Sequence, residues 1–198
     1  MTSTEFTAVI LAADRNPHDP LVQASNACCK ALVEVDGIPM LQRVISALQR
    51  SECVGDILLS GPAREQLASN AFLESALNKR QINWLAPQNS PSSSAYQAMQ
   101  HLPPNSPALL TTADHPLLTA EIVDYFLGGA LQTGADVAVG VISFSTITEK
   151  FPHAKKTVMR LRDGGYCGCN LFAFLTPQSR RVAAAWRRVE QQRKNPLR

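Results

Sequence analysis

Short apolar runs alternate along the chain with longer segments in which apolar residues recur every three or four positions. The apolar runs are nearly continuous, as strands buried on both faces of a sheet are, and they lie at residues 6–13, 56–60, 82–86 and 107–112. The periodic segments predict helices at residues 39–49, 63–79 and 95–101, and a fourth that Thr119 caps and that extends to about Leu131. Repeated strand–helix units predict an α/β fold, a three-layer sandwich around a mixed, mainly parallel sheet.

The pattern changes after residue 134. Residues 135–143 are strongly β-branched and predict a fifth strand, whereas residues 145–156 are polar without a clear period and predict a loop or a short helix. Two further strands are then predicted at 157–162 and 170–174, because the turn sequence Asp163-Gly164-Gly165 follows the first of them. A basic helix at 177–192 closes the chain, which we interpret as a single domain, residues 1–198, whose natural form extends further.

Composition is that of an ordinary globular domain. Hydrophobic residues make up 45% of the 198 residues and charged residues 18%, which is enough for one sizeable core. The net charge of +3 is small, and no basic stripe is interleaved with aromatic residues, so we expect no nucleic-acid partner. The N-terminal apolar run is too short to span a bilayer and follows no basic segment, so we expect no membrane partner.

The five cysteines form no regular framework. An odd number of cysteines fits free thiols in a reducing compartment, so we expect a cytoplasmic protein. Neither Cys28-Cys29 nor Cys167-x-Cys169 has the spacing that structural zinc sites use, which makes zinc the weaker interpretation.

The end of the first strand is a candidate phosphate site. Ala12 and Ala13 follow the strand and add no bulk, so backbone N–H groups there can approach a phosphate closely. Lys30 then opens a second apolar run and supplies the mobile positive charge that a polyphosphate needs. Small residues after a strand also occur for packing alone, and a lysine before an apolar run can simply be solvated.

A second candidate is Asp114, which follows the strand at 107–112. Open α/β sheets bind ligands at the carboxyl ends of their strands, and a carboxylate is a suitable ligand for Mg²⁺. The alternative is that Asp114 caps the turn before Pro116.

Both segments resemble the signature of the nucleotidyltransferase superfamily. Residues 8–14 (AVILAAD) and 30–41 (KALVEVDGIPML) match its phosphate loop and the lysine segment after it, and residues 108–118 (ALLTTADHPLL) match its metal-binding strand end. Within the superfamily the chain resembles the MobA-like NTP transferases, the group that contains molybdenum-cofactor guanylyltransferase. It departs from the pattern at Asp14, where a glycine is usual, and at residues 15–20, which form a longer loop with two prolines.

The resemblance implies a nucleotide-diphospho-sugar transferase-like fold, also called glycosyltransferase type A. It implies transfer of an NMP group from an NTP, with guanine as the base by analogy, to a phosphorylated small-molecule acceptor, with release of pyrophosphate and dependence on Mg²⁺. Lys30 and Asp114 would be catalytic, and Asp114 and Asn170 would bind the metal. The nucleotide would contact Leu11, Ala12, Ala13, Asp14, Arg15, Lys30, Ser92, Ser93 and Ser94.

Several of these residues have plainer interpretations. One of the serines at 92–94 caps a helix in any case, and Asn170, in the sequence Gly168-Cys169-Asn170, can be an ordinary residue at a strand edge. Lys155 and Lys156 suit an acceptor phosphate but are more simply a solvated pair. His18 and His115 are weaker candidates for catalysis, and oligomeric state is left open.

Two other functions fit the same architecture. A glycosyltransferase of this fold commonly carries an Asp-x-Asp metal motif, and the sequence Ala113-Asp114-His115-Pro116 has one carboxylate fewer. A non-catalytic nucleotide-binding relative would explain the acidic Asp14, because a carboxylate repels phosphate unless a cation offsets it. The missing second carboxylate favours the nucleotidyltransferase over the glycosyltransferase, and the non-catalytic relative stays as the alternative that Asp14 supports.

Overall fold

The computed structural model describes residues 5–14, 16 and 18–194. In this part of the chain the main sheet has seven strands, with β8 paired to β9 beside the order β5-β4-β1-β6-β9-β7. The strands are β1 (Phe6–Leu11), β4 (Val54–Ser60), β5 (Asn83–Leu85), β6 (Ala108–Thr112), β7 (Val137–Ser143), β8 (Met159–Leu161) and β9 (Gly164–Phe174). The first four run parallel, and β9 runs antiparallel to its neighbours β6, β7 and β8, which confirms a mixed, mainly parallel sheet.

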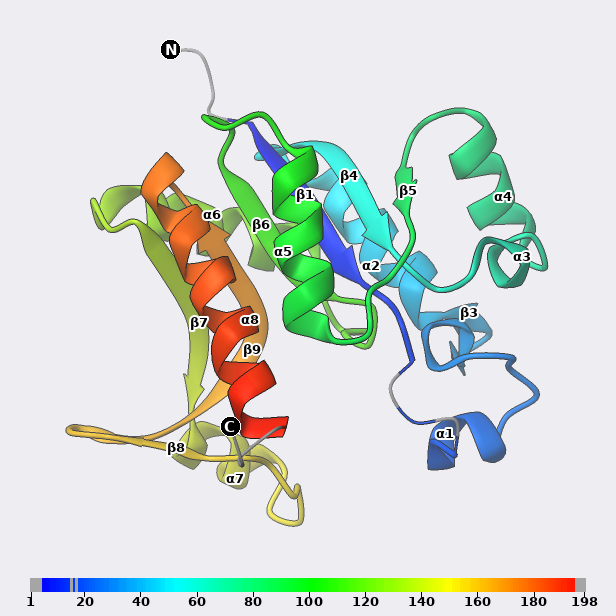
Figure 1. The fold of residues 1–198 in the computed structure, drawn as a ribbon. Helices are drawn as coiled ribbons and strands as arrows, with labels where there is room; N and C mark the ends of the chain where they lie inside the picture. Colours follow the sequence, from blue (N-terminus) through cyan, green and yellow to red (C-terminus); the bar gives the residue numbers. More distant parts are fainter. Residues whose placement is uncertain (1–4, 15, 17, 195–198) are drawn as a thin grey trace.

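Helices cover both faces of this sheet (Figure 1). The longer ones are α2 (Met40–Arg50), α4 (Ala71–Asn78), α5 (Pro91–His101), α6 (Ala120–Gln132) and α8 (Arg180–Lys194). The short ones are α1 (Pro20–Gln23), η1 (Lys30–Leu32), α3 (Arg64–Leu67), α7 (Phe144–Lys150) and η2 (Pro177–Ser179), and a small separate hairpin joins β2 (Glu34–Val35) to β3 (Ile38–Pro39). Of the helices that the structure describes, none combines the length and hydropathy needed to cross a lipid bilayer.

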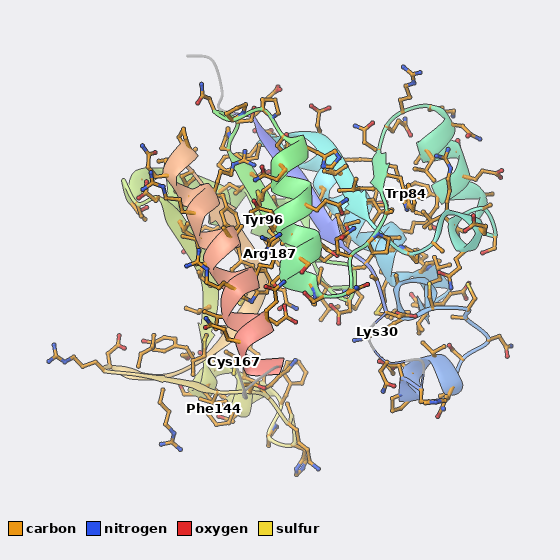
Figure 2. All side chains as sticks on the ribbon, in the orientation of Figure 1. Lys30, Trp84, Tyr96, Phe144, Cys167 and Arg187 are labelled. Atoms are coloured by element: carbon orange, nitrogen blue, oxygen red, sulfur yellow. The ribbon has the colours of Figure 1, made fainter. Side chains whose placement is uncertain are left out.

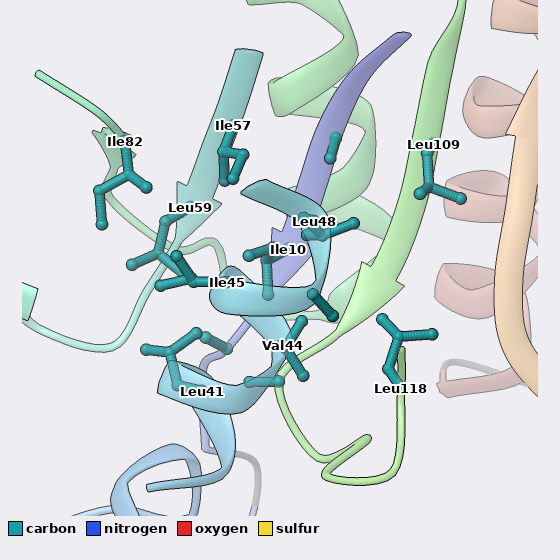
Figure 3. Close-up of a cluster of buried hydrophobic side chains, with 14 of the residues drawn as sticks. Ile10, Leu41, Val44, Ile45, Leu48, Ile57, Leu59, Ile82, Leu109 and Leu118 are labelled. Atoms are coloured by element: carbon teal, nitrogen blue, oxygen red, sulfur yellow. The ribbon is translucent and has the colours of Figure 1, made fainter. Parts of the chain in front are cut away.

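Alternation along the strands divides the core into two layers. On β1, Ala8 and Ile10 belong to the hydrophobic cluster that includes residues of α2, α4 and α6, whereas Val9 between them belongs to the cluster that includes residues of α5 and α8. This is the two-residue period of a strand buried on both faces. Figure 3 shows the larger layer, where side chains of α2 such as Val44 and Leu48 lie over the sheet. The predicted three-layer sandwich is confirmed.

The structure differs from the sequence-based prediction in four places. The helix predicted at 63–79 is two helices, α3 and α4, because Asn70 leaves helical geometry and its side chain accepts a hydrogen bond from the Leu73 N–H, which starts α4 afresh. The helix predicted at 95–101 begins at Pro91, because Ser90 caps it and proline suits a first turn. The apolar run after Lys30 is a short 3₁₀ helix followed by a two-residue strand.

The fourth difference concerns the two strands near the C-terminus. The strand predicted at 170–174 begins already at Gly164, directly after the turn, and the one predicted at 157–162 is shortened to β8. The long β9 therefore passes the ends of β6 and β7, and it carries Asn170 with it. This placement brings a residue of the C-terminal part to the carboxyl end of the parallel strands.

Candidate active site

The carboxyl ends of β1 and β6 open onto a cavity of about 980 Å³. In the sheet β1 lies between β4 and β6, and the chain passes from β1 to β4 on one side before it returns to β6 on the other side of β1. A crevice between diverging connections is the usual ligand site of an open α/β sheet. Its lining comes from the loop after β1, the ends of β4 and β6, the segment before α5, and β9.

Lys30 and Asp114 meet at this cavity, although they are far apart in the sequence. The Lys30 Nζ donates a hydrogen bond to the Asp114 Oδ2 over 2.7 Å, and the two side chains are 32% and 36% exposed. Figure 2 shows Lys30 beside the loop that follows β1. Burial alone would raise the pKa of the Asp114 carboxyl, but the hydrogen bond from Lys30, a contribution from Thr112 and the charge of Lys30 together hold that pKa below its usual value.

Asp14 has a specific partner. Its two carboxylate oxygens accept the backbone N–H of Lys30 over 3.0 and 3.1 Å. This N–H is at the start of η1, where the neighbouring residue Cys29 provides no side-chain cap. The Asp14 side chain thus connects the loop after β1 to the turn that carries Lys30. Its negative charge is stabilised by the backbone N–H at the start of η1.

The start of α5 forms another wall of the cavity. Ser90 caps the helix by accepting the Ser93 N–H, and the Ser94 hydroxyl accepts the Gln88 N–H over 2.8 Å. Ser94 lines the cavity and is buried, whereas Ser92 is buried away from it, with its N–H on the Glu190 carboxylate. The predicted cap among residues 92–94 was therefore wrong by two positions.

Ser60 ends β4 and lines the cavity floor. It is 1% exposed, and its hydroxyl has no hydrogen-bond partner within the described part of the chain. Its backbone is fixed, because the Ser60 carbonyl accepts the Ala12 N–H over 2.9 Å. A buried hydroxyl without a partner is costly, so Ser60 is an unsatisfied polar group at the end of β4 beside the cavity.

A family model described as MobA-like NTP transferase domain matches residues 8–195. The chain belongs to this family. Its fold and its standing as a nucleotidyltransferase-type enzyme, both expected from the sequence motifs, are thereby confirmed. No curated protein is significantly similar to this MobA-like domain.

Solved structures agree on the fold. A hypothetical transferase from Thermus thermophilus is 26% identical, with a TM-score of 0.73 over 98% of this chain and 75% of that one. CMP:2-keto-3-deoxy-manno-octonic acid synthetase complexed with CTP is 14% identical, with a TM-score of 0.59 over 91% and 78%. A 4-diphosphocytidyl-2C-methyl-D-erythritol synthase is 14% identical, with a TM-score of 0.64 over 93% and 81%.

Most of the predicted site residues of the MobA-like domain line the one cavity, namely Leu11, Ala12, Ala13, Asp14, Lys30, Ser94, Asp114 and Asn170. Ser92 and Ser93 do not line it, His18 is exposed outside it, and Arg15 lies outside the described residues. Sequence reasoning missed Ser60, Gln88 and Asn89, which also line the cavity. For Ser60 a signal existed, because it ends a predicted parallel strand where ligands bind.

Among the described residues next to the site, the His115 imidazole and the Cys29 thiol are both uncharged. Burial, together with the charge of Lys156, lowers the pKa of His115, whose Nδ1 is buried without a partner in the described structure. The imidazole is therefore neutral at pH 7. All five cysteines are free thiols, and burial raises the pKa of Cys29, next to Lys30, to about 12. A protonated thiol is a poor nucleophile.

Proposed function

We propose that this protein transfers an NMP group from an NTP to a phosphorylated small-molecule acceptor and releases pyrophosphate, with Mg²⁺ as cofactor. The observation that carries the proposal is the Lys30–Asp114 pair at the mouth of the cavity. It places one mobile cation and one carboxylate beside the small residues Ala12 and Ala13. Phosphoryl transfer needs positioning and electrostatic stabilisation rather than a protein nucleophile, and this set of groups suits it.

The residues fit a Mg²⁺ ion. The Asp114 carboxylate and the Asn170 amide are hard oxygen donors that line the same cavity, and within the described residues no cluster of three or more Asp, Glu, His or Cys forms an all-protein metal cage. Mg²⁺ is usually held by one or two carboxylates, with phosphates and waters completing its octahedron. A bound ion would supply charge neutralisation at the phosphates.

Lys30 has a second partner available when a triphosphate binds. In the structure its ammonium group neutralises Asp114, and triphosphate oxygens offer it a larger negative charge at the same place. Asp14 holds the backbone of Lys30, so only the side chain has to move. Lys30 would then stabilise charge that builds on the α-phosphoryl group as an acceptor phosphate oxygen attacks in line.

The acceptor would approach from the side of β9 and the loop after α7. Lys155 and Lys156 are exposed on that loop, and the charge of Lys156 reaches His115, next to Asp114. Positive charge there favours an anionic acceptor and supports a phosphorylated one. The base would occupy the uncharged wall formed by Ser60, Gln88 and Asn89.

The test is pyrophosphate release from GTP, CTP, ATP and UTP with Mg²⁺ and a panel of sugar and polyol phosphates. The family resemblance favours GTP, whereas one similar structure is complexed with CTP, so the panel decides the base. We expect release with one NTP, and a loss of about 100-fold or more in Asp114→Asn. Asp56→Asn, an exposed carboxylate on β4 that does not line the cavity, is the matched control.

The same panel, extended with nucleotide sugars, separates the alternatives. A non-catalytic relative would gain stability from an NTP, by about 2.7 kcal/mol at a hundredfold excess over Kd, without releasing pyrophosphate. A glycosyltransferase would release a nucleotide from a nucleotide sugar instead. Full activity of Asp114→Asn would contradict the assignment of Asp114.

A further inference from the structure

At Phe172, the pairing of β9 with β6 ends and its pairing with β7 is interrupted. Its pairing with β6 ends at Leu110 and Phe172, and its pairing with β7 jumps from Val139–Phe172 to Val141–Gly168. On β7 the jump passes one residue, Gly140, while on β9 it passes three, residues 169–171. A bulge with two extra residues therefore lies where β9 contributes Asn170 to the cavity.

Asn170 is the middle residue of this bulge. Its φ of 53° is in the left-handed region, which few residues other than glycine adopt and which asparagine tolerates better than most. A regular strand would alternate its side chains, whereas a bulge changes their direction and is common next to active sites. Here the bulge accompanies a polar residue that lines the same cavity as Asp114.

Gly140, opposite the bulge, makes room for it. A Cβ atom built on Gly140 would lie 3.1 Å from the Leu171 Cβ, 3.5 Å from the Leu171 carbonyl oxygen and 3.6 Å from the Cys169 Cβ. Leu171 is 2% exposed and belongs to the core, so it has little freedom to move aside. Gly140 is not among the glycines with positive φ, so space and not backbone conformation calls for glycine here.

We propose that Gly140 is a positioning residue for Asn170. The missing side chain lets Leu171 and Cys169 pack against β7, and this packing holds Asn170 in its left-handed conformation with the amide at the cation site. A methyl group at position 140 pushes on Leu171, which is bonded directly to Asn170, and moves the amide. The part of this inference that depends on the proposed function is that Asn170 binds a metal cation.

The test measures Mn²⁺ binding, by the signal of free Mn²⁺ in electron paramagnetic resonance, with an α,β-methylene analogue of each of the four NTPs. The variants are Gly140→Ala, Asn170→Gly and the double variant. Asn170→Gly accepts the left-handed φ and removes only the amide. Gly128→Ala in α6 is the control, because a Cβ there meets nothing within 4 Å.

We expect each single variant to weaken Mn²⁺ binding about tenfold, as loss of a supporting residue does at metal sites. The double variant should bind as Asn170→Gly alone does, because Gly140 acts only through the amide. Gly128→Ala should bind as the wild type does. A general loss of stability would instead weaken binding further in the double variant.

Wild-type affinity in Gly140→Ala, or additive losses in the double variant, would overturn the inference. Should Gly140→Ala not fold, Asn170→Gly decides: wild-type binding in it overturns the inference, and a tenfold loss with an unchanged melting temperature supports it. A wild type that binds Mn²⁺ and analogue but releases no pyrophosphate contradicts only the proposed function. A wild type that binds neither contradicts both.

Discussion

Replacing Lys30 with methionine separates its role in the site from its role in stability. Methionine keeps the unbranched length of the side chain and removes the charge that contacts the Asp114 carboxylate at 2.7 Å. Both side chains are about a third exposed, at 32% and 36%, so water screens the pair. Pairs of this kind contribute about 0.2–1 kcal/mol to stability.

The expected effect on turnover is much larger. A donor aimed at the charge that develops in a transition state is worth about 3–4 kcal/mol, or roughly 100- to 1000-fold in rate. Urea unfolding and pyrophosphate release, measured on the same preparations, should therefore give a small stability loss and a large rate loss for Lys30→Met. Lys30→Arg, which keeps the charge, should retain more activity than Lys30→Met.

The pair also predicts a pH dependence of stability. Because the folded pKa of Asp114 is lowered, the stabilisation is present above the ordinary carboxyl pKa and is lost as pH falls through the folded value. The difference between the wild type and Lys30→Met should therefore shrink in acid. A stability loss above about 2 kcal/mol with normal turnover would refute the reasoning, since Lys30 would then be structural.

Three other predictions follow from single contacts. Asp14→Ala should lower kcat more than Asp14→Asn, which keeps an acceptor for the Lys30 N–H; equal losses in the steady-state assay would mean that charge, not anchoring, matters. Ser90→Ala should cost about 1 kcal/mol in urea unfolding because it removes the cap of α5, while Ser93→Ala should cost less, and the reverse order would contradict the cap. His115 should titrate below the ordinary histidine value in an NMR pH series, since burial disfavours its charged form. The folded state should therefore lose stability as pH falls through the ordinary histidine pKa, because the unfolded chain then binds the proton more readily. Titration of His115 above the ordinary value would contradict this effect of burial.

The parts of the fold that local pattern determines could be predicted from the sequence. The continuous apolar runs of β1 and β6 indicate buried strands, and the Thr119 hydroxyl accepts the Ile122 N–H at the start of α6, as a helix cap should. The start of α5 was missed because Ser90 and Pro91 lie in a polar segment that also suits a loop. The start of α5 was therefore indicated by its capping residues, Ser90 and Pro91, but not by the spacing of apolar residues.

Much of the candidate site could not be predicted from the sequence, because it is formed by contacts between distant parts of the chain. The motifs single out Lys30 and Asp114, but their direct contact depends on how η1 meets the end of β6. The anchoring role of Asp14 depends on a hydrogen bond to a residue 16 positions away, and the bulge at Asn170 depends on pairing with Gly140. Such features follow from sheet register and loop packing, which no local pattern encodes.

The most direct measurement is a crystal structure of the protein with Mg²⁺ and the α,β-methylene analogue of the NTP that the pyrophosphate-release panel selects. The account predicts triphosphate oxygens at Ala13 and Lys30, because the Ala12 N–H is already bonded to the Ser60 carbonyl, with a cation on Asp114 and Asn170. A nucleotide bound elsewhere, or a Lys30–Asp114 pair left intact beneath a bound triphosphate, would contradict it.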